Sequence, residues 1–162
     1  MPLHWAIPLR HFLFGAIVAV GVGHAARVAA DQRSPPVALL PQYQQECASC
    51  HVAYPPGMLP AASWRRVIDS LSRHYGTDAS VDPATAKELA SWLTANAATY
   101  KRVREQPPQD RITRSAWFER KHRELDAAVW QRTAVGSRAN CMACHTRADR
   151  GDFDDDRVRI AK

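Results

Sequence analysis

Hydrophobic side chains recur at helical rather than alternating spacing along most of this chain. A first helix is expected to begin after Pro41 and to carry Tyr43 and Cys47. It should end near Tyr54, because the prolines that start at Pro55 prevent its continuation. No segment shows the period-two alternation of a strand, so the pattern predicts an all-α protein.

Two more helices are predicted in the N-terminal half. Ser63 is the expected N-cap of the second helix, and Gly76 its end. The apolar face of that helix is predicted to comprise Trp64, Val67, Ile68, Leu71 and Tyr75. Asp82 is the expected N-cap of the third, with Pro83 at its first position. The residues expected to face inward there are Ala86, Leu89, Leu93 and Tyr100.

The basic, proline-containing stretch Lys101–Arg111 is the best boundary between two small helical modules, 31–104 and 105–162. Beyond it, Ser115 is expected to cap a helix from about Ala116 to Arg132. One face of that helix would comprise Phe118, His122, Leu125 and Val129. The acidic tail that follows Gly151 is expected to lie on the surface.

The first thirty residues have the pattern of a secretory signal peptide, 1–30. Arg10 closes a positive segment, Phe12 to Gly23 is apolar, and Val28-Ala29-Ala30 suits cleavage. An uncleaved membrane anchor is the alternative, but these twelve apolar residues are fewer than the roughly 20 that span a bilayer. We therefore expect export to the periplasm and no stable membrane insertion after cleavage.

The net charge does not indicate a nucleic-acid partner. The chain has 22 Lys and Arg against 16 Asp and Glu, and removal of Arg10 and Arg27 would leave 20 − 16 = +4. No basic stripe with interleaved aromatic residues is present.

The strongest chemical signal is a pair of Cys-x-x-Cys-His motifs, which together use every cysteine in the chain: Cys47, Cys50 and His51, then Cys141, Cys144 and His145. This pattern is typical of c-type haem attachment and predicts two covalently bound haem c groups. The cysteines would form the thioethers, and the histidines would bind the irons.

Three other uses of the four cysteines are weaker. Two disulfides would leave the histidine after each pair unexplained. A four-cysteine zinc site usually has its pairs about 15–20 residues apart, much closer than here. A thioredoxin-type redox motif needs a βαβ setting that the sequence lacks.

The remaining histidines supply candidate distal iron ligands. Three of the seven histidines precede residue 31, which leaves His74 and His122 in addition to the two in the motifs. His122 is central in its apolar stripe, whereas His74 flanks its stripe. Met58 is the competing candidate for the distal ligand of the first iron, which His51 would bind on the other side. His74 follows His51 by 23 residues and His122 precedes His145 by 23, so loop closure favours these pairings.

Further residues match one family throughout the mature chain. They are Glu46 before the first motif, Ala53-Tyr54-Pro55-Pro56-Gly57, Ser63-Trp64, His74-Tyr75-Gly76, Arg111-Ile112-Thr113, Trp117-Phe118 with His122, Asn140 before the second motif, and Gly151-Asp152-Phe153-Asp154. With these residues the chain resembles the dihaem cytochrome c family of exported bacterial proteins.

The resemblance implies bis-histidine ligation of both haems, with His74 and His122 as distal ligands. It also implies an N-terminal module related to class I cytochromes c and a distinct C-terminal module. The implied partners are a membrane b-type cytochrome and small periplasmic haem proteins, including an oxygen-binding monohaem cytochrome c.

The sequence therefore predicts a periplasmic, low-potential electron-transfer relay that is not an enzyme. Two imidazoles per iron leave no open position for a substrate, and they do not raise the reduction potential as a thioether ligand does. The alternative is a small dihaem enzyme, a peroxidase or a sulfur-compound oxidoreductase, in which one iron has a labile axial ligand.

Overall fold

Short helices joined by turns make up the part of the chain that the structure, a computed structural model, describes: Met1, 37–99, Val103 and 105–162. The α-helices are α1 (Pro41–Cys47), α2 (Ala61–Asp69), α3 (Pro83–Ala95), α4 (Ala116–Lys121) and α5 (Ala127–Trp130). The described residues contain no β-strand, which confirms the predicted all-α class. The predicted signal peptide, 1–30, lies outside the described residues apart from Met1.

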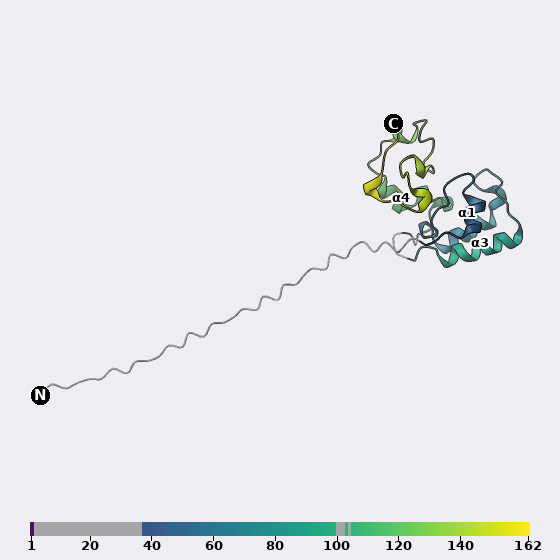
Figure 1. The fold of residues 1–162 in the computed structure, drawn as a ribbon, viewed down its shortest axis with the longest axis horizontal. Coiled ribbons are helices and arrows are strands. Elements are labelled where there is room, and N and C mark those ends of the chain that lie inside the picture. Colours follow the sequence, from purple (N-terminus) through teal and green to yellow (C-terminus); the bar gives the residue numbers. More distant parts are fainter. Residues whose placement is uncertain (2–36, 100–102, 104) are drawn as a thin grey trace. The chain divides into compact units, whose positions relative to one another are not determined.

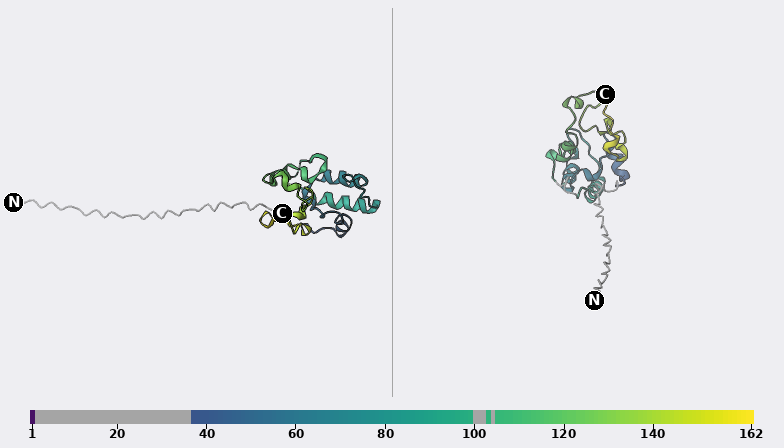
Figure 2. Two further views of the ribbon diagram at one scale, coloured as in Figure 1. Left: turned by 90° about the horizontal axis from the view of Figure 1, so that it is seen from above. Right: turned by 90° about the vertical axis from the view of Figure 1, so that its left-hand side faces the viewer.

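Single turns of 3-10 helix connect and follow these helices. They are Pro56–Met58, Leu71–Arg73, Pro108–Asp110, Ile112–Arg114, Cys141–Ala143, Ala148–Arg150 and Asp155–Arg157. Figure 2 shows that the C-terminal segment consists largely of such turns and connecting loops, whereas α3 is a regular helix. None of the helices in the described residues is long and apolar enough to cross a membrane.

The principal core lies where α1, α2 and α3 pack together (Figure 1). Leu89 and Leu93 of α3 are fully buried, and Tyr43 and Trp64 are nearly so. The Trp64 indole donates a buried hydrogen bond to the Pro56 carbonyl at 2.7 Å. The Tyr43 hydroxyl donates to the Tyr54 carbonyl at 3.0 Å. These two bonds hold the loop that follows the first Cys-x-x-Cys-His motif against the helices.

The predicted start of α3 is confirmed. The Asp82 carboxylate accepts hydrogen bonds from the amides of Ala84 and Thr85, at 2.9 and 3.0 Å. This arrangement satisfies amide groups that have no acceptor within the helix. Tyr100, which was expected to face inward, lies outside the described residues.

The first two helices differ from their predicted bounds. α1 ends at Cys47 instead of Tyr54, because the chain turns at Ala48, so only the first cysteine of the motif lies in the helix. α2 begins at Ala61, after Pro60, so Ser63 is a buried residue within the helix and is not its N-cap.

The end of α2 also falls earlier than Gly76. The Ser70 hydroxyl donates to the carbonyls of Arg66 and Val67, and the helix ends at Asp69. A 3-10 turn follows, and then Tyr75 adopts a left-handed conformation with φ of 50°. His74 is therefore presented from a turn and not from a helical face.

The predicted helix from Ala116 to Arg132 is interrupted. Ser115 caps its start as predicted, accepting from the Phe118 amide at 3.1 Å. However, α4 ends at Lys121, and Asp126 is extended, with ψ of 145°, before α5 begins. Residues 122–126 contain neither glycine nor proline, so tertiary packing overrides a local helical pattern here.

One ion pair joins α2 to the start of the C-terminal segment. Arg66 donates from Nε and from one terminal nitrogen to the two carboxylate oxygens of Asp110, at 2.8 and 2.6 Å. This guanidinium lowers the pKa of the Asp110 carboxyl below its usual range. Residues 33–162 cluster as one compact unit, and the division into modules 31–104 and 105–162 stays a prediction.

The buried leucines of α3 give a direct test of this core. Leu93→Ala should lower the free energy of unfolding by about 2–5 kcal/mol, because it removes a fully buried side chain and leaves a cavity. Denaturant unfolding of the haem-loaded protein, followed by circular dichroism, measures the loss. Val37→Ala, at a side chain that is 43% exposed, is the control and should have little effect. Equal effects would contradict the assignment of the core.

Candidate functional site

Both cysteine motifs lie in turns at the edge of the folded helices. Cys47 is the last residue of α1, and Cys141 begins the 3-10 turn Cys141–Ala143. Burial, with the charge of Glu46 as a smaller cause, raises the pKa of the Cys47 thiol to about 11. Burial likewise raises the pKa of the Cys141 thiol to about 11. A thioredoxin-type motif needs a lowered thiol pKa, so these values disfavour that use of the cysteines.

No disulfide joins any two of the four cysteines, all of which lie within the described residues. The alternative in which they form two disulfides is therefore not the arrangement in this structure.

The structure brings the first pair of predicted iron ligands together. The rings of His51 and His74 have their centres 6.1 Å apart and their planes inclined by 31°. His51 follows the first motif directly, and His74 comes from the turn after α2. Each ring has a tyrosine beside it: Tyr54 stacks on His51 at 4.9 Å, and Tyr75 lies 4.8 Å from His74.

The second pair has nearly the same separation. The ring centres of His122 and His145 lie 6.2 Å apart, with an interplanar angle of 74°. Phe118 stacks on His122 at 4.0 Å, and Phe153 lies 5.5 Å from His145. The break after α4 places His122 at the helix end, where its ring faces the second motif.

These separations match the space that one metal ion occupies between two axial imidazoles. With metal–nitrogen bonds of about 2 Å and ordinary ring bond lengths, two trans imidazoles have centres roughly 6 Å apart. No group of three or more His, Cys, Asp or Glu in the described residues is arranged to hold a metal ion. Each pair thus suits a metal whose other ligands come from elsewhere, as the porphyrin nitrogens of a haem do.

Hydrogen bonds orient two of the four rings. His51 Nδ1 lies 2.7 Å from the Val52 carbonyl oxygen, and His122 Nδ1 lies 2.9 Å from that of Phe118. A carbonyl oxygen only accepts, so the Nδ1 atoms carry the protons and donate. In the neutral ring this tautomer directs the Nε2 lone pair outward as the atom that can bind a metal. His145 differs, because its Nδ1 is buried without a hydrogen-bond partner.

The protein environment also favours neutral imidazole. Burial, with the charges of His51 and Arg111 as smaller causes, lowers the pKa of His74 below its ordinary value. Burial and the charge of His122 similarly lower the pKa of His145. Neutral imidazole is the form that binds a metal, so this shift suits both residues to ligation.

A pocket around the second histidine pair has mainly apolar walls. Its lining includes His122, His145, Cys141 and Cys144, so both tethering thiols and both imidazoles open onto it. The apolar side chains that line it are Met58, Ile112, Trp117, Phe118, Trp130, Phe153 and Val158. A largely apolar macrocycle, bound to both cysteines and lying between the two imidazoles, fits this donor set.

Met58 was the competing candidate for the distal ligand of the first iron. It lines the pocket of the second histidine pair, as Ile112 does. It therefore contributes to the walls of the other site. No local sequence pattern predicts this placement, because it depends on how the two halves pack.

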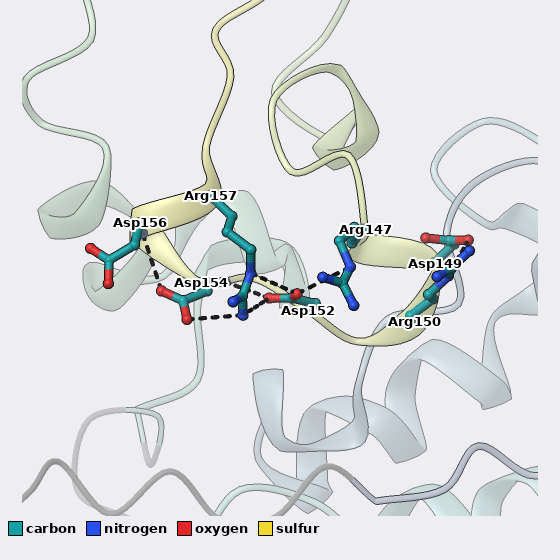
Figure 3. A network of polar contacts seen from close by, with 7 residues as sticks. All are labelled: Arg147, Asp149, Arg150, Asp152, Asp154, Asp156 and Arg157. Carbon is teal, nitrogen blue, oxygen red and sulfur yellow. Dashed lines mark hydrogen bonds and ion pairs between the residues drawn. The ribbon is translucent and has the colours of Figure 1, made fainter.

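The acidic tail is held by arginines, as Figure 3 shows. The Asp152 carboxylate contacts Arg157 Nε at 3.0 Å and Arg147 Nε at 3.5 Å. Arg157 also contacts Asp154 at 3.0 Å. Hydrogen bonding to Arg157 is the main reason why the pKa of Asp152 is lowered. This network fixes the segment that brings Phe153 against His145.

The tail also bonds to the second site itself. The Arg159 amide donates to the Cys144 carbonyl at 2.9 Å. Lys121, next to His122 in sequence, donates to Asp155 at 2.6 Å. Residues 155–160 are exposed, as predicted for the tail, whereas 151–154 are partly buried. The packing of Phe153 on His145 was not predicted.

The two motifs approach each other across a shared cavity of about 250 Å³. Cys50, His51 and Val52 line it from the first motif, and Cys141 and Met142 line it from the second. The two attachment sites are therefore neighbours, although more than ninety residues separate them in the sequence.

An all-α chain with two Cys-x-x-Cys-His motifs, each beside a pair of facing imidazoles, has the arrangement of a c-type cytochrome with two haems. The family model described as "Dihaem cytochrome c" matches residues 43–153. The chain belongs to the dihaem cytochrome c family, and it carries two covalently bound haem c groups.

Solved structures agree. A dihaem cytochrome c from Shewanella baltica OS155 is 40% identical, with a TM-score of 0.65, over 74% of this chain and 91% of that one. A dihaem cytochrome c from Rhodobacter sphaeroides is 39% identical, with a TM-score of 0.64, over 72% of this chain and 98% of that one. A search of curated proteins finds no match.

Covalent attachment can be tested by removing one cysteine pair at a time. The double substitution Cys141→Ala/Cys144→Ala should leave a chain with one covalent haem, as should Cys47→Ala/Cys50→Ala. Mass spectrometry of the denatured protein and the pyridine haemochrome assay measure the haem content. A chain that keeps two covalent haems after either change would contradict the assignment of the thioethers.

Proposed function

We propose that this protein is a periplasmic electron-transfer relay of low reduction potential, with His51 and His74 as axial ligands of one iron and His122 and His145 of the other. The observation that carries the proposal is the near-equal separation of the two imidazole pairs, 6.1 and 6.2 Å. Each bound haem supplies an iron that takes up and releases one electron.

The residues of this chain would then fill both axial positions and keep them filled. Phe118 packs on His122, and the hydrogen bonds from Nδ1 of His51 and His122 hold those rings in position. Two imidazoles give a lower potential than an imidazole with a methionine thioether, so this ligand set favours a reducing carrier.

The close approach of the two motifs supports transfer within one molecule. Because Cys50 and Cys141 line the same cavity, the groups attached to them would have neighbouring edges. An electron accepted at one site would have a short path to the other, and the chain would act as a two-site relay.

The proposed partners are a membrane b-type cytochrome as donor and a small soluble haem protein as acceptor, with an oxygen-binding monohaem cytochrome c as the specific example. Export to the periplasm fits such partners and covalent haem attachment. The signal-peptide pattern of residues 1–30 supports export.

An enzyme, either a peroxidase or a sulfur-compound oxidoreductase, is the less favoured function. It would need one iron with an open or weakly held axial position. The aromatic packing on His122 and the partly buried settings of His145 and His74 favour firm ligation at both sites.

The axial ligands can be tested by substitution. His74→Ala should convert one haem, and only one, from the low-spin to the high-spin form, and His122→Ala should do the same for the other. Low-temperature paramagnetic resonance and absorption spectra distinguish the two forms. Met58→Leu is the control, and both haems should stay low-spin because its sulfur is not proposed as a ligand. Conversion of a haem to the high-spin form by Met58→Leu would instead indicate that the Met58 sulfur is an iron ligand.

The relay itself can be tested by mixing. The reduced protein should transfer two electrons per chain to an oxidised oxygen-binding monohaem cytochrome c in a stopped-flow experiment, and it should not react faster than free haem with hydrogen peroxide. As controls, the sample should carry two haems per chain and show low-spin spectra, which establishes that both sites are intact. Rapid peroxide turnover without transfer to the cytochrome would favour the enzyme.

A further inference from the structure

One side chain connects a proposed iron ligand of the first site to the backbone just before the second motif. The Tyr54 ring stacks on His51 with centres 4.9 Å apart and planes inclined by 25°. Its hydroxyl donates a hydrogen bond to the Ala139 carbonyl at 2.8 Å, across 85 positions of sequence. Ala139 is two residues before Cys141, so this contact reaches the turn that holds the second haem.

The surroundings of Tyr54 fix it in this position. Its own carbonyl accepts a hydrogen bond from the buried Tyr43 hydroxyl, which ties the backbone at Tyr54 to the N-terminal core. At the other end, Ala139 and Asn140 line the cavity that the two motifs share. A phenol is protonated at neutral pH, so the Tyr54 hydroxyl is available as the donor of this bond.

We infer that Tyr54 is a positioning residue for electron exchange between the two haems: its ring holds His51, and its hydroxyl holds the second motif at a fixed distance from the first site. The inference rests on the proposed relay function. In each exchange event the reduced site loses one electron and the oxidised site gains it, and no bond or proton is transferred.

Tyr75 provides a matched comparison at the other axial ligand. Its ring lies 4.8 Å from His74, and its hydroxyl donates to the carbonyls of Gln109 and Asp110, at 3.2 and 3.0 Å. Like Tyr54, it is next to a proposed ligand and bonds to distant backbone. Its acceptors, however, lie in the connecting segment and not in the backbone just before the second haem motif. Tyr75 should therefore have no direct effect on exchange.

The test compares Tyr54→Phe with Tyr75→Phe in the haem-loaded protein. Phenylalanine keeps the ring beside the histidine and removes only the hydroxyl. The loss of one hydrogen bond of ordinary strength shifts an equilibrium constant by roughly two- to tenfold. The equilibrium here is between molecules in which residue 54 contacts the Ala139 backbone and molecules in which this contact is open. Exchange spectroscopy by proton NMR on the half-reduced protein measures the intramolecular exchange rate, because the haem methyl resonances separate the two sites.

For Tyr54→Phe we expect exchange to slow at least about twofold, with both haems retained and low-spin. Tyr75→Phe should keep the wild-type rate. para-Aminophenylalanine at position 54, which restores an N–H donor at the same place, should recover most of the wild-type rate.

An unchanged rate in Tyr54→Phe would overturn the inference and leave the relay function intact. Equal slowing in Tyr75→Phe would also overturn it, because the effect would then be general loosening. A Tyr54→Phe protein that lacks a haem would overturn it as well, since the hydroxyl would then be needed for assembly. High-spin iron in the resting wild-type protein would instead count against the proposed function.

Discussion

In each half of this chain, two histidines from separate segments lie with ring centres just over 6 Å apart, the spacing of two imidazoles on one iron. Most of the surrounding structure serves this spacing. Phe118 holds His122, and Phe153 lies against His145, where the arginine–aspartate network of the tail fixes its segment. In the other half, Tyr54 and Tyr75 lie beside His51 and His74. The fold is thus organised around two histidine pairs more than around one large apolar core.

This organisation explains why so much of the chain is irregular. α1, α2 and α3 supply a conventional core around Leu89 and Leu93, whereas the C-terminal segment has few regular helices and only small clusters of buried side chains. A short segment with little core of its own needs other sources of stability, and a covalently bound macrocycle supplies buried surface. The apolar walls of the second pocket are the surfaces that such a group would cover.

The sequence predicted the chemistry better than the helix bounds. The two Cys-x-x-Cys-His motifs and the count of histidines were enough to single out His74 and His122, whose rings the structure places 6.1 and 6.2 Å from those of His51 and His145. Their role as iron ligands stays a proposal. The Asp82 and Ser115 caps were also predicted, since a cap is a local interaction. The break after Lys121 was not predicted, because residues 122–126 contain no local signal and tertiary packing decides the conformation there. Met58, considered only as a weaker competitor of His74 for the first iron, lines the second pocket, and only packing between the halves determines that position.

The adjacency of the two motifs has the greatest functional consequence, and no sequence pattern contained it. The shared cavity and the Tyr54–Ala139 hydrogen bond place the attachment sites side by side. The central claim is that four imidazoles saturate two irons. Low-temperature paramagnetic resonance of the oxidised protein as purified, with spins counted against haem content, tests it most directly. The account predicts two low-spin ferric centres per chain and no high-spin signal. A stoichiometric high-spin centre would contradict it.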